Sequence, residues 1–194
     1  MFQDLDKTLA ALLQRELAAS NVAVSFAAPD SSFPPMEVTL PAVDLFLYDV
    51  RENLELHSND WHHETQNGRI LRHKAPIRID CSYLITAWSS ATNPIDDEHR
   101  LLGEVMKVLL RYRQLPDDVL QGELIGLHPP VRARAMRSGY LQSLGEFWQA
   151  MGGKPKASLH YTLTISANIF APEDLGVPTT ERIVKLQQGV AGKK

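Results

Sequence analysis

Hydrophobic residues recur along the chain at helical spacing in three places, and each place predicts a helix. Residues 4–18 predict the first helix, because leucines at positions 5, 9, 12, 13 and 17 form one apolar stripe. A second helix is predicted from Asn93-Pro94, a favourable cap and first-turn pair, to the arginines at 111 and 113. The third is short: Ser143 and Glu146 form a capping box that opens it.

Apolar residues alternate with polar ones elsewhere, which is the spacing of strands. The predicted strands lie at 22–26, 42–57, 77–87 and 159–165. The strand at 42–57 is apolar on both faces at first, and one face then turns polar at Asp49, Arg51 and Glu55. Because alternate residues face opposite sides of a sheet, we expect this strand to begin between two packed layers and to end at water or a partner.

Asn67-Gly68 predicts a hairpin between two of these strands, because both residues of a two-residue turn must accept positive φ. The turn fixes the register, so His62 opposes His73, and Asp60 opposes Ala75. Pro76 is expected to separate the hairpin from the strand that follows.

The hairpin register suggests one chemical alternative. Asp60, His62, Glu64 and His73 would share a face, which is a sensible ligand group for a divalent metal. Trp61 would lie on the opposite face. A catalytic metal needs a rigid and shielded site, whereas a polar hairpin tip is exposed, so a solvated or interface-forming hairpin is the favoured interpretation.

These elements predict the α+β class: a mixed or antiparallel sheet of about four strands, packed on one face by two to three helices. Residues 123–140 are expected to be a long connection that carries a basic cluster of Arg132, Arg134 and Arg137. From residue 171 onward the chain is expected to be a flexible tail, in which residues 181–187 can add to a sheet edge.

Composition narrows the function classes. The chain has 194 residues, is 44% hydrophobic and carries a net charge of -3, so neither a nucleic-acid nor a membrane partner is indicated. It has one cysteine, Cys81, placed among core residues, which favours a buried structural thiol over a nucleophile. We find no nucleotide-binding or nucleophile-elbow motif, no signal peptide and no membrane span. A cytoplasmic protein without cofactor or catalysis is expected.

Three stretches, in order, resemble a known family. They are LPAVDLFLYDVRENLELHSNDW (40–61), RIDCSYLITAWSS with DDEHRLLGEVMKVLLRY (78–112), and LQSLGEFWQAMGGKPKASLHYTLTIS (141–166). The pattern resembles the N-terminal domain of the cap, or tail-terminator, proteins of extracellular contractile injection systems, which are phage-tail-like particles. The likeness covers roughly residues 3–170, so the expected organisation is one cap domain at 1–170 followed by a flexible tail at 171–194.

The resemblance implies an assembly role. It implies a ring, a hexamer in the family, at the distal end of the inner tube, where it ends tube growth and contacts the sheath. Such a protein would assemble in the bacterial cytoplasm, within a particle that the cell can release. The expected contact residues are Asp49, Arg51, Glu55, Asp60, Trp61, His62 and His73, with Arg132, Arg134 and Arg137 as a second group. The alternatives are a metal-dependent hydrolase that uses the His62/His73 face, and a generic adaptor domain.

Overall fold

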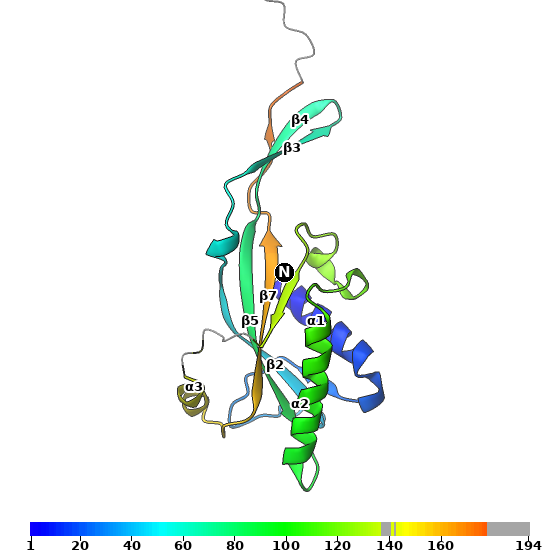
Figure 1. The fold of residues 1–194 in the computed structure, drawn as a ribbon, viewed down its shortest axis with the longest axis vertical. Coiled ribbons are helices and arrows are strands. Elements are labelled where there is room, and N and C mark those ends of the chain that lie inside the picture. The colour runs from blue at the N-terminus through cyan, green and yellow to red at the C-terminus, as the bar shows by residue number, and fades with distance from the viewer. Residues whose placement is uncertain (137–140, 142, 178–194) are drawn as a thin grey trace, which may run out of the picture. The chain divides into compact units, whose positions relative to one another are not determined.

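The computed structural model describes residues 1–136, 141 and 143–177, and these residues belong to two compact units. Unit 1 consists of Met1–His57 and Ile77–Ala167, and contains all the helices among the described residues and the larger sheet (Figure 1). Unit 2 contains Ser58–Pro76 and the residues from Asn168 onward. Pro76 therefore lies at the boundary that its sequence position predicted.

Unit 1 is built on a five-stranded sheet with the order β1-β2-β5-β7-β6. The strands are β1 (Ala23–Ser25), β2 (Ala42–Glu52), β5 (Ile77–Trp88), β6 (Arg132–Ala135) and β7 (Ser158–Ala167). β1 pairs in parallel with β2, and the other neighbours are antiparallel, so the sheet is mixed. The α+β prediction is confirmed, but the sheet has one strand more than expected, because part of the supposed long connection forms β6.

Two long helices cover one face of this sheet. They are α1 (Phe2–Glu16) and α2 (Pro94–Arg111), and their leucine and valine stripes are buried against the central strands. The short connections that complete this side are the 3-10 helices η1 (Ala18–Ser20), η3 (Asp117–Val119) and η4 (Gly122–Leu124). The core lies here, and residues such as Leu9, Tyr83 and Leu163 have an exposed fraction of no more than 1%.

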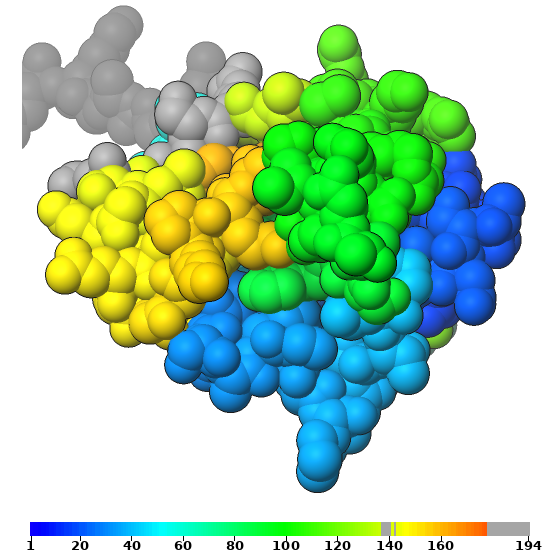
Figure 2. Space-filling model, turned by 90° about the horizontal axis from the view of Figure 1, so that it is seen from below, coloured from blue at the N-terminus to red at the C-terminus, as the bar shows by residue number. Residues whose placement is uncertain are grey.

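The third helix, α3 (Leu144–Ala150), lies on the other face of the sheet, which corrects the expectation that all helices share one face (Figure 1). The Ser143 side chain caps it, accepting a hydrogen bond from the Glu146 amide at 3.2 Å. Phe147 packs against Phe46 of β2, with ring centroids 6.1 Å apart. Seen from below, α3 (yellow), α2 (green) and the segment before β2 (blue) form the surface at this end of unit 1 (Figure 2). The part of this second face around Phe46 is therefore covered by α3.

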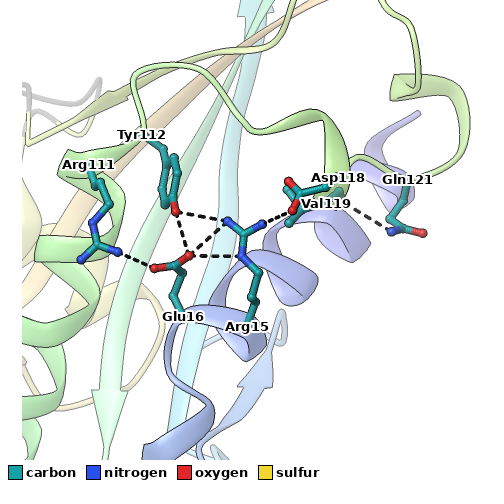
Figure 3. Close-up of polar contacts among 7 residues, drawn as sticks. All are labelled: Arg15, Glu16, Arg111, Tyr112, Asp118, Val119 and Gln121. Carbon is teal, nitrogen blue, oxygen red and sulfur yellow. Dashed lines mark hydrogen bonds and ion pairs between the residues drawn. The ribbon is translucent and has the colours of Figure 1, made fainter.

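A polar network joins α1 to α2 and η3 near the ends of the two long helices (Figure 3). The Glu16 carboxylate accepts hydrogen bonds from Arg15 (3.1 Å), Arg111 (2.5 Å) and the Tyr112 hydroxyl (2.7 Å). Arg15 also donates to Asp118 of η3 at 2.6 Å. These contacts lower the pKa of Glu16, first through the Tyr112 hydrogen bond, and they tie the helical layer together.

Strand β2 contains an irregularity that the sequence pattern did not reveal. Its register against β5 shifts between Leu47 and Asp49, so Tyr48 forms a bulge. A bulge adds one residue to one strand, and alternation is out of phase beyond it. Strict alternation would place Phe46 and Val50 on one face, but Phe46 opposes Leu84, whereas Val50 opposes Cys81 on the core side.

Strand β2 also ends earlier than predicted, at Glu52 rather than 57. Asn53 ends it: its side-chain oxygen accepts a hydrogen bond from the Leu56 amide at 3.0 Å, which closes the 3-10 turn η2 (Leu54–Leu56). The Asn53 amide group also donates to Asp80 of β5 at 2.9 Å. Glu55 therefore lies in a helical turn and is exposed.

Unit 2 is a three-stranded antiparallel sheet with the order β3-β4-β8. Its strands are β3 (Trp61–Gln66), β4 (Arg69–Lys74) and β8 (Glu173–Asp174). Asn67 and Gly68 form the tight turn with φ of 51° and 73°, as their types predicted. β8 differs from the prediction, because it falls within the segment 171–194, for which the sequence predicts a flexible tail. Residues 181–187 lie outside the described part of the chain.

Candidate functional site

The residues predicted for contacts lie on two surfaces, one in each unit. Asp49, Arg51, Arg132 and Arg134 project from the second face of the five-stranded sheet, beyond the part that α3 covers. Asp60, Trp61, His62 and His73 belong to the hairpin of unit 2. Arg137 lies outside the described residues.

The sheet register brings the two predicted groups of unit 1 onto one face. Arg51 opposes Asp80, Asp80 opposes Thr164, and Thr164 opposes Arg132, so these four residues form a row across four strands. A second row, next to the first, contains Asp49, Ser82, Thr162 and Arg134. We call these eight residues the polar face. Sequence spacing alone could not have joined Arg51 to Arg132, because β5 and β7 lie between them.

Hydrogen bonds occupy the floor of the polar face. Asp80 is 3% exposed and accepts hydrogen bonds from the Thr164 hydroxyl at 2.6 Å and the Asn53 amide group at 2.9 Å. Ser82 and Thr162 lie within 3.3 Å of each other. A buried carboxylate with two donors keeps neighbouring strands in a fixed register. The floor is therefore a rigid support for the charged residues at its two sides.

The charges at the two sides of the polar face differ in their partners. On β2, Arg51 is paired with Asp49 through two hydrogen bonds of 2.7 Å, a bidentate arrangement. On β6, Arg132 is exposed and Arg134 is half-buried, and neither forms an ion pair with any described residue. The β6 side consequently has positive charge that the described residues do not neutralise.

The hairpin of unit 2 carries a different surface. All six residues of β3 are exposed, and the Arg72 guanidinium lies 4.2 Å from the centre of the Trp61 ring. Arg72 also pairs with Glu173, and Arg69 pairs with Asp174 at 2.6 Å, so two arginines hold β8 in place. These two arginines of the hairpin are therefore paired within the described part of unit 2.

The hairpin register places His62 opposite His73 as predicted. The Nε2 atom of the half-buried His73 lies 3.6 Å from the carboxylate of the exposed Glu64, which makes a weak pair. In the described residues, however, no three histidine, cysteine, aspartate or glutamate side chains converge as a metal site requires. The pairing of the strands was predicted correctly, but the described side chains do not gather into the ligand group that the hydrolase alternative needs.

Two other places could have held catalytic groups. Cys81 is fully buried, and burial raises the pKa of its thiol to about 12, so it is not poised as a nucleophile. A cavity of about 370 Å³ lies beside the start of α2 and is lined in part by Ser20, Ser89, Asp97 and Arg100. The Asp97 carboxylate accepts hydrogen bonds from Arg100 at 3.3 Å and from the Ser89 hydroxyl at 3.5 Å, and among the described residues that line the cavity there is no histidine to pair with a serine.

The chain belongs to the family described as the Pvc16 N-terminal domain, whose profile matches residues 4–173. None of the helices in the described part of the chain is long and apolar enough to cross a membrane. A search of curated proteins finds no match.

Similar chains among the solved structures include two that are named as terminators of contractile particles. One, the sheath/tube terminator of the extracellular contractile injection system PVC in its extended state, is 25% identical with a TM-score of 0.72. The alignment covers 100% of this chain and 65% of that one. The other, the tube-terminating cap of the anti-feeding prophage, is 23% identical with a TM-score of 0.65, over 94% of this chain and 60% of that one. This chain thus spans less than two thirds of either relative, and the predicted terminator-like fold is confirmed.

Proposed function

We propose that this protein is a structural cap, or terminator, of a contractile injection system. The observation that carries the proposal is the likeness to the PVC sheath/tube terminator, which extends over the whole of this chain at a TM-score of 0.72. The protein would form a ring, a hexamer by the family resemblance, at the distal end of the inner tube and would end tube growth there. Its partners would be further copies of itself, the tube protein and the sheath protein, and it would catalyse no reaction.

The two surfaces described above suit this role. A ring needs contacts that are rigid before assembly, because fewer side chains must then be ordered on binding. Arg51 is held by Asp49 and stands beside the hydrogen-bonded floor of the polar face. The hairpin exposes Trp61, and aromatic residues are enriched in the centres of interfaces. We place the ring and tube contacts on these surfaces, with residues 1–170 as the cap domain and 171–194 as its tail.

Electron microscopy of the protein mixed with purified tubes tests the proposal. Rings, or tubes with closed ends, are the expected result, and Arg51→Glu should reduce capping while circular dichroism stays unchanged. Lys107→Glu is the matched control, because Lys107 is exposed on α2, which covers the sheet face opposite to the polar face. If neither rings nor capped ends form, the generic adaptor becomes the better assignment, whereas stoichiometric zinc in tag-free protein would revive the hydrolase.

A further inference from the structure

Strand β3 is an open edge of the sheet in unit 2, because β4 is its one neighbour in the described structure. The hydrogen bonds of β4 show which backbone groups of β3 point outward. The Ile70 amide donates to the Gly176 carbonyl at 2.8 Å on the β8 side, so the next residue, Leu71, points toward β3, where it opposes Glu64. Inward and outward groups alternate along a strand. The residues of β3 whose backbone groups face outward are therefore Trp61, His63 and Thr65.

This edge lacks the features by which proteins usually protect an open strand. Such edges are kept short, or carry lysine, proline or a bulge. β3 has six residues, all exposed, with neither lysine nor proline among them, and its register against β4 is continuous. Its outward backbone groups have no partner in the described part of the chain. Unpaired groups on such an edge are a template for another extended strand.

A second copy of β3 offers the longest matching edge among the described strands of this chain. β1 has three residues and β8 has two. The outer edge of β6 is partly occupied, because the Ala133 amide donates to the Arg113 carbonyl at 2.9 Å and the Leu115 amide to the Val131 carbonyl at 3.2 Å. Two copies of β3 can instead pair antiparallel about a two-fold axis, which makes the contact the same for both.

Charge selects one register for this pair. A two-fold axis at His62 would place Asp60 opposite Glu64 of the other copy, and an axis at Glu64 would place the two glutamates opposite each other. Like charges directly opposite are destabilising. An axis at His63 avoids both arrangements and brings His62 opposite Glu64 of the other copy. An imidazole N–H can donate to that carboxylate.

The same register suits the backbone and the remaining side chains. With the axis at His63, all three outward-facing residues of each copy oppose one another, whereas an axis at residue 62 or 64 would use only two of them. Trp61 then opposes Thr65 of the other copy on both sides of the axis. Pairs of an aromatic and a β-branched residue stabilise antiparallel strands.

We propose that two copies of this protein pair through the outer edges of β3, antiparallel and with His63 at the two-fold axis. A ring of more than two subunits joins two different patches at each contact, whereas this contact uses one patch twice. The dimer is therefore a state of the free protein and goes beyond the proposed ring: it covers the edge before assembly. The contact is small, so its dissociation constant should lie between about 1 µM and about 1 mM.

Cysteine cross-linking of the full chain tests the pairing and its register. In His63→Cys the two new thiols oppose each other with Cα atoms about 5.5 Å apart, which a disulfide can span. Gln66→Cys is the matched control in the same exposed strand, since its two Cα atoms would lie about 20 Å apart at about 3.3 Å per residue. Under mild oxidation His63→Cys should form a covalent dimer, and Gln66→Cys should remain a monomer. The native Cys81 is buried and does not compete.

Sedimentation of the reduced protein measures the dimer without a cross-link. Glu64→Lys should raise the dissociation constant by on the order of tenfold, because His62 then opposes a lysine in place of a carboxylate. His62→Glu combined with Glu64→Lys exchanges the two partners and should restore the wild-type constant. Lys107→Glu reverses a charge on α2 and should leave the dimer unchanged.

Three results would overturn the inference. One is a wild type that sediments as a monomer up to about 1 mM, which would leave the edge to a strand of another protein. Another is equal cross-linking of both cysteine variants, which would mean random collision or a different register. The third is a dimer that Glu64→Lys does not weaken, which would place the contact on another surface. Capping is measured separately by microscopy: capped tubes without a free dimer refute only this inference, and a dimer without capping refutes only the particle assignment.

Discussion

Asp44 should make the stability of this protein depend on pH in a way that one substitution removes. It lies in β2 with an exposed fraction of 0%, and neither carboxylate oxygen has a hydrogen bond in the described structure. Burial raises the pKa of Asp44 from 3.8 to about 7. The Ser25 side chain and the Ala27 amide lower this pKa, but by less than burial raises it. The buried carboxyl group is thus neutral at pH 5 and charged at pH 8.

The magnitude follows from the difference between folded and unfolded pKa values. About three pKa units at about 1.4 kcal/mol each correspond to about 4 kcal/mol. The folded state holds the proton more tightly, so the Asp44 contribution is fully favourable below pH 3.8 and is lost as the pH rises to about 7. Between pH 5 and pH 8 the loss is about 3 kcal/mol.

The assay is urea unfolding of the wild type and Asp44→Asn at pH 5 and pH 8. The amide cannot ionise, so the variant should gain about 3 kcal/mol relative to the wild type between the two pH values. Any constant cost of burying the amide cancels in this comparison. Asp30→Asn is the control: Ser32 lowers the pKa of Asp30 below 3.8, so this group stays charged at both pH values and its difference should not change. A difference for Asp44→Asn that is the same at pH 5 and pH 8 would refute the reasoning.

Three further changes test the core. Tyr83→Phe removes a 2.7 Å hydrogen bond to Asp6 and should lower the free energy of unfolding, measured by urea titration, by about 1–2 kcal/mol. An unchanged free energy of unfolding would show that this hydrogen bond does not stabilise the fold. Gly122→Ala should cost about 1–3 kcal/mol by thermal unfolding, because φ is 56° and a Cβ would collide with the Asp4 carboxyl group; an unaltered midpoint would show that the turn relaxes freely. Cys81 should react with a thiol reagent at pH 8 only as fast as the protein unfolds, and rapid labelling would show that the thiol is accessible.

Local chemistry made several elements predictable from the sequence. Asn67-Gly68 determines its turn through the positive φ of both residues, and the register from His62 to His73 follows directly. Asn93 precedes the first residue of α2 as expected, although its side chain donates to Asp96 at 3.1 Å instead of capping an amide. In each case the deciding interactions lie within a few residues, so the sequence window contains them.

Longer-range contacts decided the features that could not be predicted. β6 has only four residues and no apolar run, and it is a strand because β7 offers it a ladder. His160 lies on the polar side of its strand's alternation, yet it is half-buried and its Nδ1 lies 3.3 Å from the hydroxyl of Tyr48. Tyr48 is itself the bulged residue, and no local signal marked it.

The polar face depends on both of these unpredicted features. Without the bulge at Tyr48, β2 would alternate strictly, and Phe46, Tyr48 and Val50 would all lie on one side of the sheet. Asp49 and Arg51 would then face the core. Without β6, Arg132 and Arg134 would have no fixed direction. The bulge costs β2 part of its ladder, and proteins use bulges to redirect side chains near functional surfaces. The irregularity in β2 therefore has a structural consequence that fits the proposed role: it aligns charges from strands at both sides of the sheet on one outward surface.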